Sequence, residues 1–270
     1  MAHPDNTQEI AKVRAYIVEA EAELTELGIF PRVITRYPFD SVALATVSKA
    51  FALSKACLAL LTSGFPDEAY GLSRSLVECA VNLRHLTEDP TLLDQRTDEF
   101  IRYFFADKAY WLHYALQQFG GKPEEQQIRE YAKELGLDPD AKSVRRHWSG
   151  ISGFAWQVML VSHPLDGPAT AELQKKASYA VDYHQTSSFV HCSQPALDNY
   201  FCEGRTPFRV SPSSGKYDQP SQKTLFIILI YLYSTIAYAL FGMNIERPGA
   251  LKALFHATLN SMKPAQRRHS

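Results

Sequence analysis

The fold is organised around residues 70–86, which read YGLSRSLVECAVNLRHL. Three polar residues recur every fourth position in this stretch, so on an α-helix they lie in one row on the same face: Arg74, Glu78 and Asn82. We call them the first polar row. Because the neighbouring residues are apolar and an isolated buried charge is costly, we expect Arg74 and Glu78 to be buried as an ion pair. The stretch therefore predicts a core helix with one polar face.

A second polar row occurs later in the chain, in a segment rich in apolar and aromatic side chains. Its members also recur every fourth position and are Tyr179, Tyr183, Ser187 and His191. This spacing predicts a helix over residues 168–191. Glu78 can accept a hydrogen bond from an imidazole, and Arg74 has five N–H donors that need acceptors. We therefore expect helices 67–87 and 168–191 to pack side by side, with their polar rows facing each other.

Apolar residues at helical spacing, bounded by proline, glycine and capping residues, predict the remaining elements. The expected helices cover residues 5–27, 40–62, 67–87, 91–119, 124–135, 150–161, 168–191, 225–241 and a short stretch after Pro248. No alternating stretch is long enough to build a sheet. The fold class is therefore all-α, a single-domain helical bundle of about seven to nine helices. We divide it into an N-terminal helix and connector (1–39), a bundle core (40–243) and a short helical tail (244–270).

The most hydrophobic stretch is residues 225–241, which read LFIILIYLYSTIAYALF. It is short for a membrane-spanning helix and contains three tyrosines, Ser234 and Thr235, so we expect a buried bundle helix. The expected second helix, 40–62, is also nearly all apolar, which predicts a central and largely buried position. The N-terminus lacks the charged and apolar regions of a signal peptide. These features favour a soluble cytoplasmic protein with no membrane partner.

Charge and cysteine usage exclude several classes of function. The formal net charge of −1 and the pI near 6.8 give no strong signal for nucleic-acid binding. None of the four cysteines forms a Cys-x-x-Cys pair. One cluster could hold a metal ion, but its spacing fits no standard template: His184, His191, Cys192 and Cys202. The phosphate-binding, nucleophile-elbow and metalloprotease motifs are also absent, so we predict neither a metal nor a cofactor.

The first polar row lies in a motif that resembles a known family. Residues 74–83 (RSLVECAVNL), followed by Asp89-Pro90, are similar to the first motif of a mainly bacterial helical family, domain of unknown function 5677. Residues 183–191 are similar to its second motif, and the resemblance covers roughly residues 45–240. It implies an all-helical domain and points to four residues: Arg74, Glu78, Ser187 and His191. The family has no described activity, so the resemblance implies none.

A weaker resemblance is to the helical ribonucleases of toxin and phage-defence systems. Those enzymes have an arginine and a histidine four to six residues apart on one helix, and no such pair occurs in this chain. Arg74 and His191 brought together in space would offer similar acid–base groups. This alternative is a metal-independent ribonuclease-like enzyme with His191 as acid or base.

Three hypotheses about function follow from the two polar rows. In the first, Arg74, Glu78 and His191 are catalytic, with His191 as acid or base, Glu78 orienting it and Arg74 binding an anionic group. In the second, the same residues with Asn82, Tyr179, Tyr183 and Ser187 bind a small anionic ligand or nucleotide in a regulatory or defence role. In the third, Arg74 and Glu78 form a structural pair and the protein acts through its surface. We also expect a homodimer, because the aromatic face of residues 100–114 and helix 225–241 exceed what one modest core requires.

Overall fold

The computed structural model describes residues 6–30, 38–103 and 219–262, the strand residues 201–202 and 209–210, and a few single positions between 126 and 165. Its labelled helices are α1 (Thr7–Glu26), α2 (Pro38–Thr62), α3 (Pro66–Thr87), the 3-10 turn η1 (Pro90–Leu92), α9 (Gln219–Gly242) and α10 (Gly249–Met262). Residues 93–103 continue as a helix after η1. The predicted all-α class is confirmed for this part of the chain. The number of helices and the domain division stay predictions.

Two short strands are the exception to the helical pattern. β1 (Phe201–Cys202) and β2 (Arg209–Val210) pair antiparallel, with Phe201 opposite Val210 and Cys202 opposite Arg209. A sheet of two strands with two residues each is too small to form a layer of its own. It lies in a segment for which no sheet was expected.

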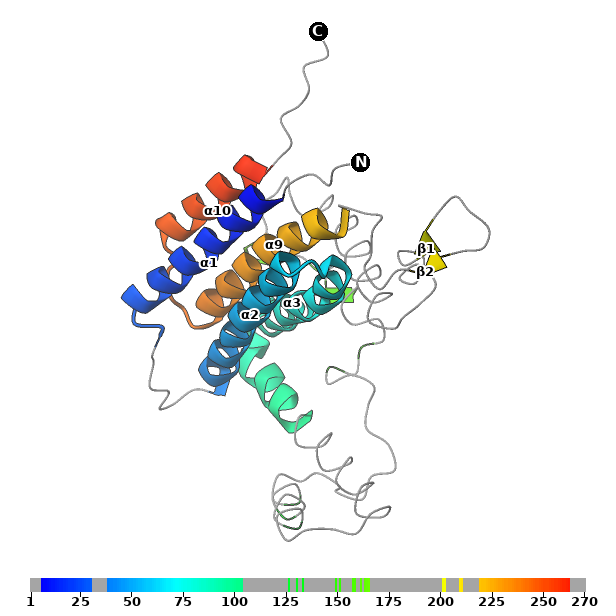
Figure 1. The fold of residues 1–270 in the computed structure, drawn as a ribbon. Helices are drawn as coiled ribbons and strands as arrows, with labels where there is room; N and C mark the ends of the chain where they lie inside the picture. Colours follow the sequence, from blue (N-terminus) through cyan, green and yellow to red (C-terminus); the bar gives the residue numbers. More distant parts are fainter. Residues whose placement is uncertain are drawn as a thin grey trace.

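The centre of the bundle is the pair formed by α3 and α9, which make the most extensive contact in the described structure. α2 packs against both of them. α1 and α10 lie side by side on the outside and cover α2 and α9 (Figure 1). Buried side chains of all five helices join one hydrophobic core, from Val13 on α1 to Leu251 on α10.

Three helices end in the same way, with a residue in the left-handed backbone region. Gly28 after α1 has φ +67° and Gly64 after α2 has φ +81°, a conformation that glycine adopts without steric cost. Asn244 takes this position after α9 with φ +55°. There the Ile245 N–H bonds to Leu240 O at 2.8 Å and the Asn244 N–H bonds to Phe241 O at 3.0 Å. These bonds satisfy the last carbonyls of α9 and turn the chain toward α10.

The positions of the two apolar helices differ in part from the expectation. α9 is well enclosed, and most of its side chains between Leu225 and Leu240 are buried. α2 is less central than predicted, because one side of it exposes small or charged residues such as Ala45, Lys49 and Ala52. Both helices are long and apolar enough to cross a membrane by length and composition alone. That test does not separate a membrane span from a core helix.

Three helices approach one another closely at Gly242, at the end of α9. A Cβ atom at this position would overlap the ring of Phe39 on α2 and lie 2.7 Å from Cγ2 of Thr87 on α3. Gly242 therefore lets the first turn of α2 and the last turns of α3 and α9 converge. This convergence forms one wall of the cavity described below.

Candidate functional site

The first polar row lies on one face of α3, as predicted. Arg74 Nε donates to Glu78 Oε1 at 3.0 Å, and Asn82 follows one turn later. The Arg74 side chain is 20% exposed and the Glu78 side chain 45% exposed. The pair is thus more accessible than its apolar sequence context indicated. The flanking Leu76 and Leu83 take the fully buried positions, which leaves the polar row at the edge of the core.

The second polar row lies outside the described residues. Tyr179, Tyr183, Ser187 and His191 all belong to segments of which the structure describes no side chain, and the same holds for the proposed metal cluster of His184, Cys192 and Cys202. The expectation that the two rows face each other therefore stays a prediction. In the described residues, no group of three or more histidine, cysteine or acidic side chains could hold a metal ion.

A buried triad extends the first polar row toward the end of α3. His85 lies three helical turns after Arg74 on the same face. Its Nδ1 is 3.1 Å from Glu88 Oε1, and Arg96 Nη1 donates to the same oxygen at 3.0 Å. Arg96 also donates to the backbone oxygen of His85 at 2.6 Å. We call His85, Glu88 and Arg96 the buried triad.

The electrostatics of the triad favour an ionised carboxylate. Burial alone would raise the pKa of Glu88, but the hydrogen bonds and charges of His85 and Arg96 outweigh it and lower that pKa below its ordinary value. The Glu88 side chain is only 8% exposed, and its Oε2 atom is buried without a hydrogen-bond partner in the described structure. Sequence reasoning missed this triad, although a histidine and a glutamate three residues apart on a helix were a visible signal.

Arg84 connects α3 to two distant parts of the chain. Its Nη1 donates to Tyr238 Oη on α9 at 2.7 Å, and its Nη2 donates to the Val161 carbonyl at 2.7 Å. Nε lies 3.4 Å from the Val158 carbonyl, and the guanidinium carbon lies 5.7 Å from the centre of the Tyr238 ring. With a side chain only 2% exposed, Arg84 serves as a structural anchor rather than a group that can meet a ligand.

A buried histidine completes the same anchor. His163 Nδ1 accepts a hydrogen bond from the Leu165 N–H at 3.0 Å, so this nitrogen has no proton of its own. The proton of the neutral ring is therefore on Nε2, which lies 3.0 Å from Thr87 Oγ1. The ring packs edge-on against Tyr238 and Phe241 at 4.7 and 5.3 Å between centroids. His163 thus fixes residues 163–165 against the ends of α3 and α9.

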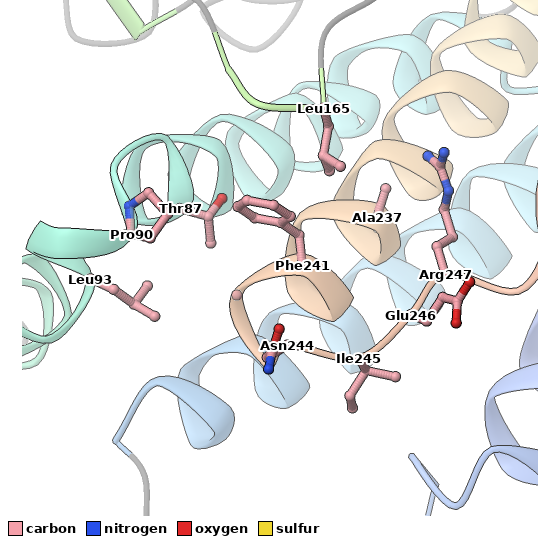
Figure 2. Close-up of a pocket in the computed structure, with 11 residues that line it drawn as sticks. Thr87, Pro90, Leu93, Leu165, Ala237, Phe241, Asn244, Ile245, Glu246 and Arg247 are labelled. Atoms are coloured by element: carbon pink, nitrogen blue, oxygen red, sulfur yellow. The ribbon is translucent and has the colours of Figure 1, made fainter.

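A cavity of about 550 Å³ lies beside this anchor, between the end of α3, η1, the end of α9 and the turn into α10. Most of its wall is apolar, and its lining residues are Thr87, Pro90, Leu93, Leu165, Ala237, Phe241, Gly242, Asn244, Ile245, Glu246 and Arg247. Thr87, Pro90 and Leu93 stand at one side of the Phe241 ring, and Glu246 and Arg247 stand at the other (Figure 2). Sequence reasoning did not identify this cavity.

Comparison with known proteins places the chain in a family. The family of unknown function DUF5677 matches residues 40–205, more than half of the 270 residues. The chain belongs to this family. The resemblance stated from the motifs is thereby confirmed, and the match includes both polar rows. It does not extend to α9, the principal partner of α3.

The family description assigns no activity to its members. No curated protein and no solved structure matches the chain. The likeness to helical ribonucleases therefore has no further support.

Proposed function

We propose that this member of DUF5677 is a cytoplasmic protein that binds a small anionic ligand of the phosphate or nucleotide class at the first polar row. The observation that supports this most is the face of α3, on which a partly exposed arginine is held by a carboxylate and is followed along the same face by Asn82. A guanidinium suits phosphate oxygens because its N–H groups form a planar fork. Glu78 restricts Arg74 to one geometry, so less side-chain entropy is lost on binding.

The second polar row completes the proposed site. Ser187 and His191 would contact the ligand opposite Arg74, and Asn82, Tyr179 and Tyr183 would line its walls. A double-mutant cycle tests this arrangement without a structure. Glu78→Gln and His191→Gln should show a coupling of about 1 kcal/mol in ligand binding, because side chains in one site are not independent. If the two substitutions change the binding free energy additively, the prediction that the two polar rows face each other is contradicted.

The binding itself is tested by titrating the full-length protein with inorganic phosphate, AMP and ATP in a calorimeter. Arg74→Gln should lower the affinity at least about tenfold, which corresponds to about 1.4 kcal/mol. The matched control is Arg102→Gln, because Arg102 also forms an i,i+4 ion pair, with Asp98 at 2.6 Å, on an exposed helix surface. Absence of binding by all three probes, or an equal effect of both substitutions, would contradict the proposal.

A second candidate is acid–base chemistry on the bound ligand. In this ribonuclease-like alternative, His191 acts as acid or base. His85 is oriented by Glu88 at Nδ1, but it is buried and lies three helical turns from Arg74, so its substitution serves as the control. Cleavage of an RNA oligonucleotide in the presence of EDTA, measured for His85→Gln and His191→Gln, distinguishes the two histidines. Lack of any cleavage by the unaltered protein would leave ligand binding as the function.

The remaining parts of the proposal concern location, assembly and role. We expect a soluble homodimer with a regulatory or defence role, and the enclosure of α9 within the bundle supports solubility. Detergent-free purification and light scattering test this expectation. A constant mass of 30.4 kDa over a wide concentration range would exclude the dimer. Partition of the untagged protein into membranes washed with carbonate would exclude solubility.

A further inference from the structure

The turn between α9 and α10 places the positively charged side chain of Arg247 at the edge of the cavity. The Asn244 cap fixes the backbone that leads into Glu246 and Arg247. The guanidinium carbon of Arg247 lies 5.5 Å from the centre of the Tyr233 ring, and the Tyr233 ring is stacked on Phe255 of α10 at 4.1 Å. These ring contacts hold the arginine in place.

Arg247 has no carboxylate within ion-pair distance among the residues that the structure describes. Its side chain is half-buried, whereas that of its neighbour Glu246 is exposed. Because water screens an exposed charge much more than a half-buried one, the field at this edge of the cavity is governed by Arg247. Burial raises the pKa of Tyr233 and the Arg247 guanidinium opposes part of that rise, so the phenol next to Arg247 stays neutral at physiological pH. The edge therefore attracts an anion.

The other walls determine what kind of anion fits. Away from Arg247, the cavity surface is formed by Phe241, Ile245 and Leu93 with the backbone of Gly242. The volume of about 550 Å³ falls within the range of small-molecule sites, which are mostly apolar with a few polar groups that fix orientation. A phosphate alone would leave these walls in contact with water. An apolar body attached to the anion would cover them.

We propose that this cavity binds a small carboxylate with an apolar body, separately from the ligand of the first polar row. The carboxylate would pair with the guanidinium of Arg247, and the body would lie over Phe241 toward Pro90 and Leu93, which line the same cavity. The two oxygens of a carboxylate match the planar fork of the guanidinium. Burial of the apolar body supplies most of the affinity, and Arg247 supplies the selectivity for charge.

Three probes of equal chain length test this site: octanoate, octanol and octylamine. In calorimetric titrations of the full-length protein, octanoate should bind at least about tenfold more tightly than the other two. Arg247→Gln should reduce the affinity for octanoate to the affinity for octanol. The control Lys252→Gln removes an exposed cation of α10 that does not line the cavity, and it should leave octanoate binding unchanged.

The site is located by amide chemical shifts. Octanoate should shift the amides of Ala237, Gly242 and Ile245, which line the cavity. Arg74→Gln should not alter octanoate binding, so failure of the proposed phosphate site and failure of this site are distinguishable. Equal affinity for octanoate and octanol, tighter binding of octylamine, or an equal effect of Lys252→Gln and Arg247→Gln would overturn the inference.

Discussion

Arg74 and Arg84 belong to the same helix and have opposite roles. Arg74 is 20% exposed and pairs with a carboxylate one turn away. Arg84 is almost fully buried, and its donors meet a phenol oxygen and main-chain carbonyls from segments far away in the sequence. Exposure and the kind of partner, rather than residue type or apolar sequence context, therefore separate an arginine that can meet a ligand from one that holds the fold together.

Removing Arg84 should give the largest effect on stability. Arg84→Ala breaks the charge-assisted hydrogen bonds of a side chain that is 2% exposed and leaves the carbonyl of the buried Val158 without this donor, so we expect a loss of about 4 kcal/mol. Arg84→Lys should lose less stability, because lysine keeps the positive charge although it lacks the planar N–H donors of the guanidinium. Urea unfolding midpoints measure both variants. A loss below about 1 kcal/mol for Arg84→Ala would remove the distinction between the two arginines.

The next largest effect should come from the buried triad. Glu88→Gln removes the negative charge shared by His85 and Arg96, and we expect a loss of about 3 kcal/mol at neutral pH. Because the pKa of Glu88 is lower in the folded state, its contribution is complete above the ordinary value of 4.5 and is lost as the pH falls through the folded value. In urea unfolding at several pH values, the free energy of unfolding should fall less steeply at acid pH for Glu88→Gln than for the unaltered protein. An equally steep fall in both proteins would mean that Glu88 does not contribute.

A smaller effect is expected at the far end of the Arg84 anchor. Tyr238→Phe removes the hydroxyl that accepts from Arg84 at 2.7 Å, and the loss should be about 1–2 kcal/mol. Because the two side chains share one hydrogen bond, the double variant with Arg84→Ala should lose clearly less than the sum. Additivity in the unfolding free energy would show that this bond contributes little.

The smallest effect concerns the pair that the sequence placed in the core. Since the Glu78 carboxylate is 45% exposed, Glu78→Ala should cost only about 0.5–1 kcal/mol, the range of surface ion pairs. Salt should weaken the contribution further because water and ions reach the pair. Thermal unfolding in low and high salt provides the measurement. A loss of about 3 kcal/mol or more would mean that Arg74 and Glu78 are as structural as Arg84.

The sequence predicted the local elements well because their signals are local. Helical spacing, the Gly28 and Gly64 stops and Pro66 at the start of α3 located the first three helices to within about two residues. The same periodicity placed the first polar row on one face. Its degree of exposure could not be predicted, because that depends on which neighbours pack on each side of the helix.

The non-local features of the site had no sequence signal. Arg84 finds its partners at Val158, Val161 and Tyr238, and nothing in the spacing of these residues links them. The cavity likewise arises where α3, α9 and the turn after α9 converge around Gly242. Composition and periodicity describe one helix at a time, so they cannot predict a site formed by tertiary packing.

The pairing of α3 with α9 also determines when the core can be completed during synthesis in the cell. The two helices are separated in the chain by residues 88–218, so α3 leaves the ribosome well before its main partner exists. At 5–20 residues per second, this interval lasts on the order of 10 s. During that time the face of α3 that packs against α9 lacks this partner, and the nascent chain presents hydrophobic surface to chaperones. A fragment that ends at residue 205, where the family match ends, would remain in that incomplete state.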